Sequence, residues 1–174
     1  MLRSRGVNEG ITNVLILCTG NSARSILGEA ILAAQGSGRI SAYSAGSKPK
    51  AGPHPGALRL LARKGINPGP FRSKSWDEFT QRAAPRIDLA ITVCGNAAGE
   101  ACPVFMGAPL KAHWGLADPV GVEGDDAAVD AAFERTWRLL NIRAAALLAL
   151  PFETMARNQF KAALAKIGAM EGAA

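Results

Sequence analysis

A short run in the first third of the chain, CTGNSARS, combines a nucleophile with a fixed positive charge. Five small residues separate Cys18 from Arg24, and Ser25 follows the arginine. A cysteine whose pKa is lowered attacks as a thiolate, and a guanidinium group can hold two oxygens of an anion at once. The run therefore indicates covalent attack by a thiol on a bound oxyanion.

The residues on either side of this run predict a turn from a strand into a helix. The run over residues 13–17 is mostly apolar and typical of a buried parallel strand, and apolar residues recur at helical spacing from Ala23 to Gly36, with Ser22 as the expected N-cap. Backbone N–H groups would then converge on an anion, with Asn21 tolerating a left-handed conformation. The expected oxyanion-binding residues are Thr19, Gly20, Asn21, Ser22, Ala23 and Arg24.

This environment predicts a lowered pKa for the Cys18 thiol, with a hydroxyl of Ser22 or Ser25 donating a hydrogen bond to the thiolate. The run lacks the GK[ST] ending of a nucleotide-binding loop, which argues against ATP or GTP. A buried, unreactive cysteine is the alternative reading of Cys18 taken alone. The arginine and serine at this spacing favour the reactive reading.

The rest of the chain alternates between strand and helix patterns. This order predicts an α/β fold with a mostly parallel sheet. The strand over 88–94 ends on Cys94, much as the first strand ends on Cys18, and Cys102 lies in the loop that follows. The other expected elements are a strand at 40–46, a short strand after residue 109, and helices at 53–65, 72–83, 125–150 and 152–167.

Composition narrows the class of protein. A chain of 174 residues with 48% hydrophobic and 20% charged residues is typical of one globular domain, which we expect over 13–174 after a flexible leader at 1–12. No apolar run is long enough to span a membrane. The net charge of +6 favours acidic partners, and the scattered Lys and Arg residues argue against nucleic acid and for small oxyanions.

Three cysteines in a chain without a secretion signal predict reduced thiols and a cytoplasmic protein. A zinc site built from Cys94, Cys102 and His113 is disfavoured, because the spacing is wrong and a fourth ligand is missing. No metal and no cofactor is therefore expected.

CTGNSARS resembles the C-x5-R-S phosphate-binding loop of low-molecular-weight protein tyrosine phosphatases, and LADPVG resembles the loop that carries their general-acid aspartate, here Asp118. Within that superfamily, ITVCGNAAGEACP and AHWGLADP are more similar to arsenate reductases of the thioredoxin-coupled type. The resemblance covers residues 13–118. It implies a four-stranded parallel sheet flanked by helices in three layers.

The resemblance implies that Cys18 attacks arsenate, that Arg24 and the loop amides stabilise the charge, and that Asp118 protonates the departing oxygen. Cys94 would then attack the Cys18 sulfur and release arsenite, and Cys102 would resolve the resulting disulfide. Thioredoxin, or glutaredoxin with glutathione, would supply the electrons, and phosphate or sulfate would mimic the substrate. The alternatives are a phosphatase that hydrolyses phosphomonoesters through Cys18, and a module that binds oxyanions or senses thiols without turnover.

Three sequence features differ from the families that the chain resembles, and they concern the substrate, the thiol relay and a potassium site. Val120 and Gly121 follow the Asp-Pro pair where the phosphatases carry tyrosines, which favours a small inorganic oxyanion. The spacing from Cys94 to Cys102 is one residue longer than in the best-known arsenate reductases. RSKS, residues 72–75, replaces a segment whose aspartate helps to bind a potassium ion there, so Lys74 stands near the other candidate residues for that site, Asn21, Glu29 and Ser44.

Overall fold

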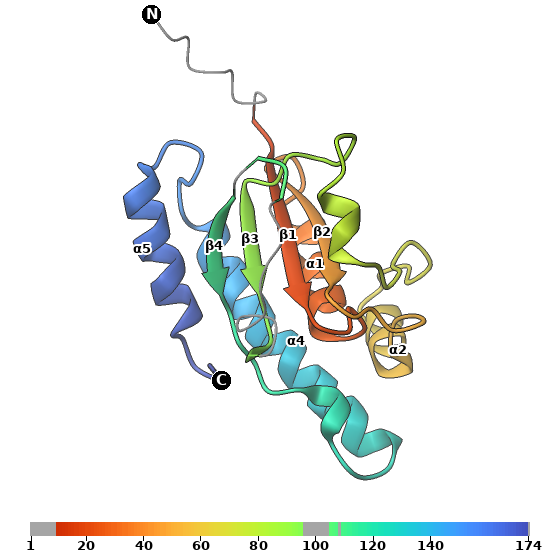
Figure 1. Ribbon diagram of the computed structural model, residues 1–174. Helices are drawn as coiled ribbons and strands as arrows, with labels where there is room; N and C mark the ends of the chain where they lie inside the picture. Colours follow the sequence, from red (N-terminus) through yellow and green to blue (C-terminus); the bar gives the residue numbers. More distant parts are fainter. Residues whose placement is uncertain (1–9, 96–104, 108, 174) are drawn as a thin grey trace, which may run out of the picture.

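Four parallel strands form the centre of the protein in this computed structural model, which describes residues 10–95, 105–107 and 109–173. The sheet has the order β2-β1-β3-β4, so β1 lies between β2 and β3 (Figure 1). This arrangement confirms the predicted parallel sheet. The strands are β1 (Thr12–Cys18), β2 (Ile40–Gly46), β3 (Leu89–Thr92) and β4 (Leu110–His113).

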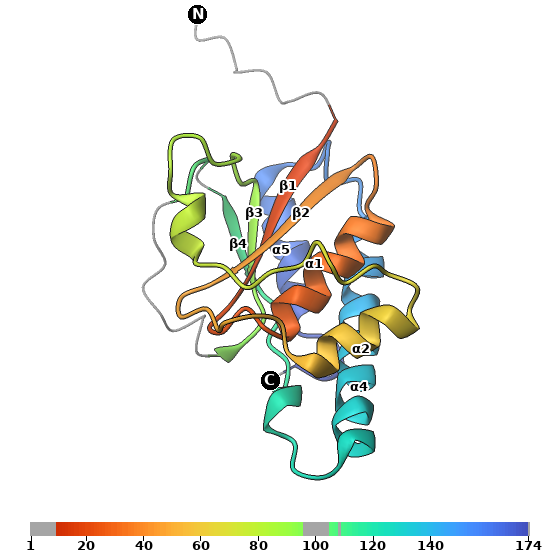
Figure 2. The same cartoon turned by 90° about the vertical axis from the view of Figure 1, so that its right-hand side faces the viewer.

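Helices cover one face of the sheet, and a short 3-10 helix lies on the other (Figure 2). α4 is the longest helix and packs against both α1 and α2, while α5 packs against β4. The three-layer arrangement expected from the resemblance is therefore present. The helices are α1 (Arg24–Gln35), α2 (Pro55–Arg63), η1 (Trp76–Phe79), η2 (Pro119–Gly121), α4 (Asp126–Leu148) and α5 (Arg157–Gly168).

The alternation of side chains along β1 divides the core into two parts. Val14 and Ile16 face the α1 and α4 side, whereas Leu15 and Leu17 pack with Phe79 of η1 on the opposite face. All four of these β1 side chains are buried. A strand that is apolar on both faces must be central in a covered parallel sheet, and this fixes the place where its last residue, Cys18, emerges.

Several element boundaries differ from the sequence-based prediction. α1 begins at Arg24 with Ala23 as the N-cap and without a side-chain cap, so the predicted Ser22 cap is wrong. The last helix begins at Arg157 rather than near residue 152, because a turn closed by hydrogen bonds to the Pro151 carbonyl precedes it. The strand at 40–46 coincides with β2, and Asp125 is the N-cap of α4.

Parallel pairing brings the carboxyl ends of the strands together at one edge of the sheet. Cys18 pairs with Gly46, and Leu17 pairs with Thr92 two residues before Cys94. The α/β rule that binding crevices lie beyond the carboxyl ends of strands therefore points to this edge. Most of the predicted leader, residues 1–9, lies outside the described residues, so the leader and the domain boundary at residue 13 stay predictions.

Candidate active site

The turn from β1 into α1, residues 18–25, is here called the oxyanion loop. Asn21, Ser22, Ala23 and Ser25 are buried, and Asn21 adopts a left-handed conformation with a φ of 46°. A short polar side chain tolerates this conformation better than most residues do, as the sequence predicted. The loop thus passes directly into the N-terminus of α1, where unpaired backbone N–H groups favour an anion.

The Asn21 side chain holds the oxyanion loop from beneath. Its amide Nδ2 donates to Ser25 Oγ at 2.8 Å and to Ser44 Oγ at 3.0 Å, and its Oδ1 accepts from the backbone N–H of Lys74 at 2.9 Å. Ser73 Oγ donates to the Asn21 carbonyl at 2.5 Å. Every polar atom of the Asn21 side chain is therefore used to fix the loop rather than to touch a ligand.

The segment after β2 supports the oxyanion loop from the side. The backbone N–H groups of Lys48 and Lys50 donate to the carbonyls of Thr19 and Gly20, each at 2.9 Å. The approach is so close at Gly46 that a Cβ atom there would lie 2.4 Å from the Thr19 carbonyl oxygen. Glycine at position 46 therefore lets β2 and the loop come into backbone contact, a requirement that the sequence analysis missed.

Arg24 lies at the first position of α1 and its side chain is mostly buried. Its Nη1 donates to the Leu116 carbonyl at 2.8 Å, and its Nη2 lies 3.5 Å from Asp118 Oδ2. Nε is buried with no hydrogen-bond partner among the described residues. The guanidinium group is thus anchored at one end and retains a donor for an oxyanion.

Asp118 comes from the loop after β4 and is brought next to Arg24 across 94 positions of sequence. Its side chain is 50% exposed, and Oδ1 accepts from the Val120 N–H at 3.0 Å as the N-cap of η2. This cap fixes the carboxyl group while leaving Oδ2 toward Arg24. An acid in this position can donate a proton to a group bound beside Arg24.

Cys18 and Cys94 lie close together at the carboxyl ends of neighbouring strands; both are buried, and neither forms a disulfide with a described cysteine. Cys94 Sγ also lies 3.6 Å from Thr19 Oγ1. The Cys94 thiol, followed by burial, raises the pKa of Cys18 above its ordinary value, and these effects outweigh the opposing influence of Arg24 and the Thr19 N–H. The predicted lowering is therefore wrong, because two neighbouring thiols disfavour a second negative charge.

Of the other thiol and zinc-ligand candidates, Cys102 and His113, the structure describes only His113. Cys102 lies outside the described residues, so its predicted role is not placed. His113 is exposed, and its Nδ1 lies 2.7 Å from Thr92 Oγ1. No cluster of three or more metal-binding side chains occurs in the part of the chain that the structure describes.

A half-buried charge cluster lies next to the oxyanion loop. Ser44 Oγ donates to Glu29 Oε2 at 2.6 Å, and burial raises the pKa of the Glu29 carboxyl group although Lys74 acts in the opposite direction. Burial lowers the pKa of Lys74, while Glu29 acts to raise it. The sequence suggested Asn21, Glu29 and Ser44 as neighbours, but it gave no signal that the Lys74 backbone also binds the Asn21 amide.

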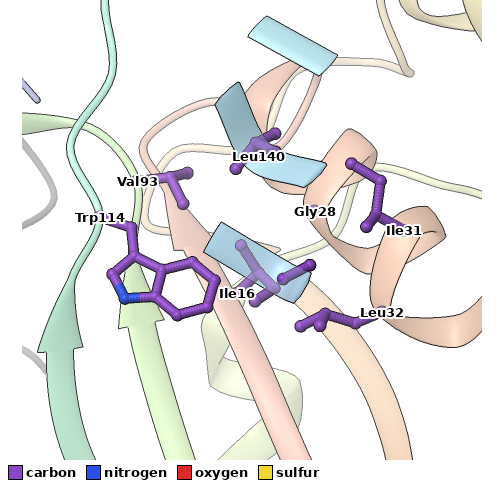
Figure 3. A pocket seen from close by; sticks show the side chains of 8 residues that line it. Ile16, Gly28, Ile31, Leu32, Val93, Trp114 and Leu140 are labelled. Atoms are coloured by element: carbon purple, nitrogen blue, oxygen red, sulfur yellow. The ribbon is translucent and has the colours of Figure 1, made fainter. Parts of the chain in front are cut away.

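The cavity shown in Figure 3 lies away from the oxyanion loop, between the sheet and helices α1 and α4. Its volume of about 10 Å³ is too small for a substrate, and its lining is apolar. The lining residues of the cavity are Ile16, Gly28, Ile31, Leu32, Val93, Trp114, Leu140 and Ala144.

None of the described helices is long and apolar enough to cross a membrane.

Comparisons with known proteins agree with this geometry. Residues 13–162 match the family described as low molecular weight phosphotyrosine protein phosphatase. An arsenate reductase of Halalkalibacterium halodurans is 33% identical over 122 residues, which cover 70% of this chain and 84% of that protein.

Solved structures of arsenate reductases and phosphatases also align with this chain. The thioredoxin-dependent arsenate reductase of Corynebacterium glutamicum aligns with a TM-score of 0.53 and 26% identity over 76% of this chain. This chain spans 62% of that protein's length. A low molecular weight phosphotyrosine phosphatase of Vibrio cholerae aligns with a TM-score of 0.60 and 23% identity, covering 79% of this chain and 94% of that one, which shows a shared fold.

Proposed function

This chain belongs to the low molecular weight phosphotyrosine protein phosphatase family, and from that premise we propose that it is an arsenate reductase. The observation that carries the proposal is the placement of two buried thiols, Cys18 and Cys94, beside each other at the ends of neighbouring strands. Hydrolysis of a phosphoryl-cysteine needs one thiol, a positive charge and an acid. A second buried thiol beside the first is what reduction requires in addition.

The first step is attack on arsenic. The Cys18 thiolate forms a bond to the arsenic(V) of arsenate, while Asp118 delivers a proton to an arsenate hydroxyl group, which leaves as water. Arg24 Nε and the N–H groups of the oxyanion loop stabilise the remaining oxygens. Because Cys94 raises the pKa of Cys18, a proton must move from the pair of thiols before or during this attack.

The second step is reduction by the neighbouring thiol. Cys94, as a thiolate, attacks the sulfur of Cys18, and the electron pair of the sulfur–arsenic bond passes to arsenic, which leaves as arsenite. Two thiols thereby lose two electrons and become a Cys18–Cys94 disulfide. Cys102 is proposed to attack that disulfide next, freeing Cys18 for another turnover.

An external dithiol must then restore the oxidised cysteines. The Corynebacterium glutamicum protein is described as thioredoxin-dependent, and this supports thioredoxin as the reductant, with glutaredoxin and glutathione as the alternative. The cytoplasmic location expected from reduced thiols stays a prediction.

A phosphatase is the second candidate, because Cys18, Arg24 and Asp118 would also suit a phosphomonoester and the family is described by that activity. The experiment compares the wild-type protein and Cys94→Ser in two assays, arsenite release with a thioredoxin system and hydrolysis of p-nitrophenyl phosphate without thiols. We expect wild-type arsenite release that stops without thiol and is lost in Cys94→Ser. Thiol-independent hydrolysis as the main activity would instead identify a phosphatase, and phosphate binding without either turnover a non-catalytic module.

A further inference from the structure

We infer that Lys50 is a specificity-determining residue of the oxyanion site, and that its ammonium group selects small oxyanions with two negative charges over those with one. The inference rests on the proposed function and adds to the site a residue from the segment that follows β2. Lys50 acts in it through its charge and takes no part in bond formation or proton transfer.

The backbone of Lys50 is tied to the oxyanion loop. Its N–H donates to the Gly20 carbonyl at 2.9 Å, just after the Lys48 N–H donates to the Thr19 carbonyl, so the two backbones lie side by side (Figure 2). Pro49 stands between the two lysines, where its ring fixes its own φ and disfavours the helical conformation for Lys48. The Lys50 side chain therefore starts from a fixed point beside the loop.

The side chain of Lys50 lies across Gly20. A Cβ atom at Gly20 would be 3.3 Å from Lys50 Cγ, 3.6 Å from Cδ and 3.3 Å from Cε. Because three successive carbons lie this close, the stem of the lysine runs along the loop and does not point straight into solvent. Lys50 is exposed, so its ammonium group, one bond beyond Cε, lies at the solvent-facing rim of the loop.

Lys50 also carries a positive charge that no described carboxylate offsets. None of the ion pairs between described residues involves Lys50. Arg24, in contrast, has a carboxylate oxygen of Asp118 3.5 Å from its Nη2. An anion beside Arg24 would thus meet a guanidinium group whose charge is partly offset whenever Asp118 is ionised. The Lys50 ammonium adds the positive charge that a second negative charge on the anion requires.

The substrate and the product of the proposed reaction differ in charge. Arsenate, like phosphate, carries roughly one to two negative charges near neutral pH, whereas arsenite is present there as uncharged arsenous acid. The Coulomb energy of one ammonium group with a dianion is twice that with a monoanion at the same distance, and it vanishes for a neutral molecule. Lys50 would therefore favour capture of the arsenate dianion without slowing the release of arsenite.

The test compares two tetrahedral anions of similar shape, sulfate with two negative charges and perchlorate with one. Their affinities are measured by calorimetric competition with phosphate at constant ionic strength for wild type, Lys50→Gln and Lys50→Arg. We expect Lys50→Gln to weaken sulfate binding by at least about fivefold and perchlorate binding by only about twofold, because the monoanion loses half the Coulomb energy. Lys50→Arg keeps the charge and should retain the sulfate affinity.

Arsenate turnover gives a second readout. In Lys50→Gln the KM for arsenate should rise by about the same factor as the Kd for sulfate, with little change in kcat, because Lys50 contacts no reacting atom. The control is Lys111→Gln, which removes the same charge from an exposed position on β4 and should match wild type. Because Lys50 is itself exposed, Lys50→Gln should fold like the wild-type protein.

Four results would overturn the inference: an unchanged sulfate affinity in Lys50→Gln, an equal fold loss for sulfate and perchlorate, a loss that Lys111→Gln shares, or a change confined to the KM for thioredoxin. The last result would assign Lys50 to docking of the reductant. If perchlorate competes too weakly to measure, the sulfate loss and its recovery in Lys50→Arg decide. A wild-type protein that binds neither sulfate nor phosphate would overturn the proposed function itself.

Discussion

Arg24 and Asp118 face each other at the carboxyl edge of the sheet, with Arg24 Nη2 at 3.5 Å from Asp118 Oδ2. One comes from the start of α1 and the other from the loop that follows β4. The Leu116 carbonyl binds the same guanidinium group, so the loop that carries the acid also anchors the arginine. A permanent positive charge and a carboxyl group are thus placed beside one another and beside the oxyanion loop.

Replacing Arg24 by lysine keeps the charge but removes the planar group that binds the Leu116 carbonyl and that we propose binds an oxyanion as well. We expect kcat/KM for arsenate to fall by at least about tenfold, equal to about 1.4 kcal/mol of transition-state stabilisation. Steady-state kinetics with the thioredoxin system would measure this change. Unchanged kinetics in Arg24→Lys would remove Arg24 from the site.

Asp118→Asn should slow formation of the arsenic adduct by about 100-fold, because an amide cannot donate a proton as an acid. The amide oxygen can still accept from the Val120 N–H, so the cap of η2 should survive. Single-turnover arsenite formation should therefore fall while the Kd for phosphate changes little. A single-turnover rate equal to that of wild type would require another acid.

Cys94→Ala should lower the pKa of Cys18, because Cys94 makes the largest contribution to raising it. Only the thiolate reacts with iodoacetamide, so the midpoint of the alkylation rate against pH should move to lower pH. The measurement is made on Cys102→Ser as the parent protein, with peptide mapping to follow Cys18 alone. A midpoint that stays in place or rises would show that burial, and not the neighbouring thiol, controls Cys18.

The order of the thiols can be read after one turnover. Cys102→Ser should accumulate a Cys18–Cys94 disulfide after one equivalent of arsenate, since these two thiols lie beside each other at the ends of neighbouring strands. Cys94→Ser should stop before any intramolecular disulfide forms. Peptide mapping distinguishes the products, and a Cys18–Cys102 link as the main early product of the wild-type protein would make Cys94 a structural residue.

Gly46→Ala should damage both stability and anion binding, because the new Cβ would lie 2.4 Å from the Thr19 carbonyl oxygen and 3.0 Å from the Asn21 nitrogen. Such overpacking costs about 1–3 kcal/mol of unfolding free energy. Gly52→Ala is the matched control, since nothing lies within 4 Å of a Cβ there. Urea unfolding and phosphate calorimetry should separate the two variants, and similar behaviour of both would contradict the close packing of β2 against the loop.

The elements that carry local signals could be predicted from the sequence. Residues 40–46 form β2 as expected, and Cys18 ends a strand that turns into a helix. Local signals misled where tertiary contacts decide: Ser22 has the chemistry of an N-cap, but it lies buried within the oxyanion loop and α1 begins two residues later. The pKa of Cys18 could not be predicted because its main cause, Cys94, lies 76 positions away.

The contacts that support the oxyanion loop could not be predicted either, because they join residues far apart in the sequence. Arg24 and Cys18 share a motif, so their proximity follows from the spacing alone. The bond between the Lys74 backbone and Asn21 joins residues 53 positions apart and involves a backbone N–H, which no side-chain pattern encodes. Gly46 likewise reads in the sequence as an ordinary strand end, and only the distance to Thr19 shows why a side chain there is excluded.

The parallel sheet also has a practical consequence for attaching the molecule to a surface. β1 begins at Thr12 and ends at Cys18, so its first residue lies about 20 Å from the reactive thiol, at the opposite edge of the sheet (Figure 1). A tether attached upstream of Thr12 would hold the molecule to the surface by the edge of the sheet that lies far from Cys18. An immobilised protein would then present its thiol pair outward, in the orientation that an arsenate-sensing electrode needs.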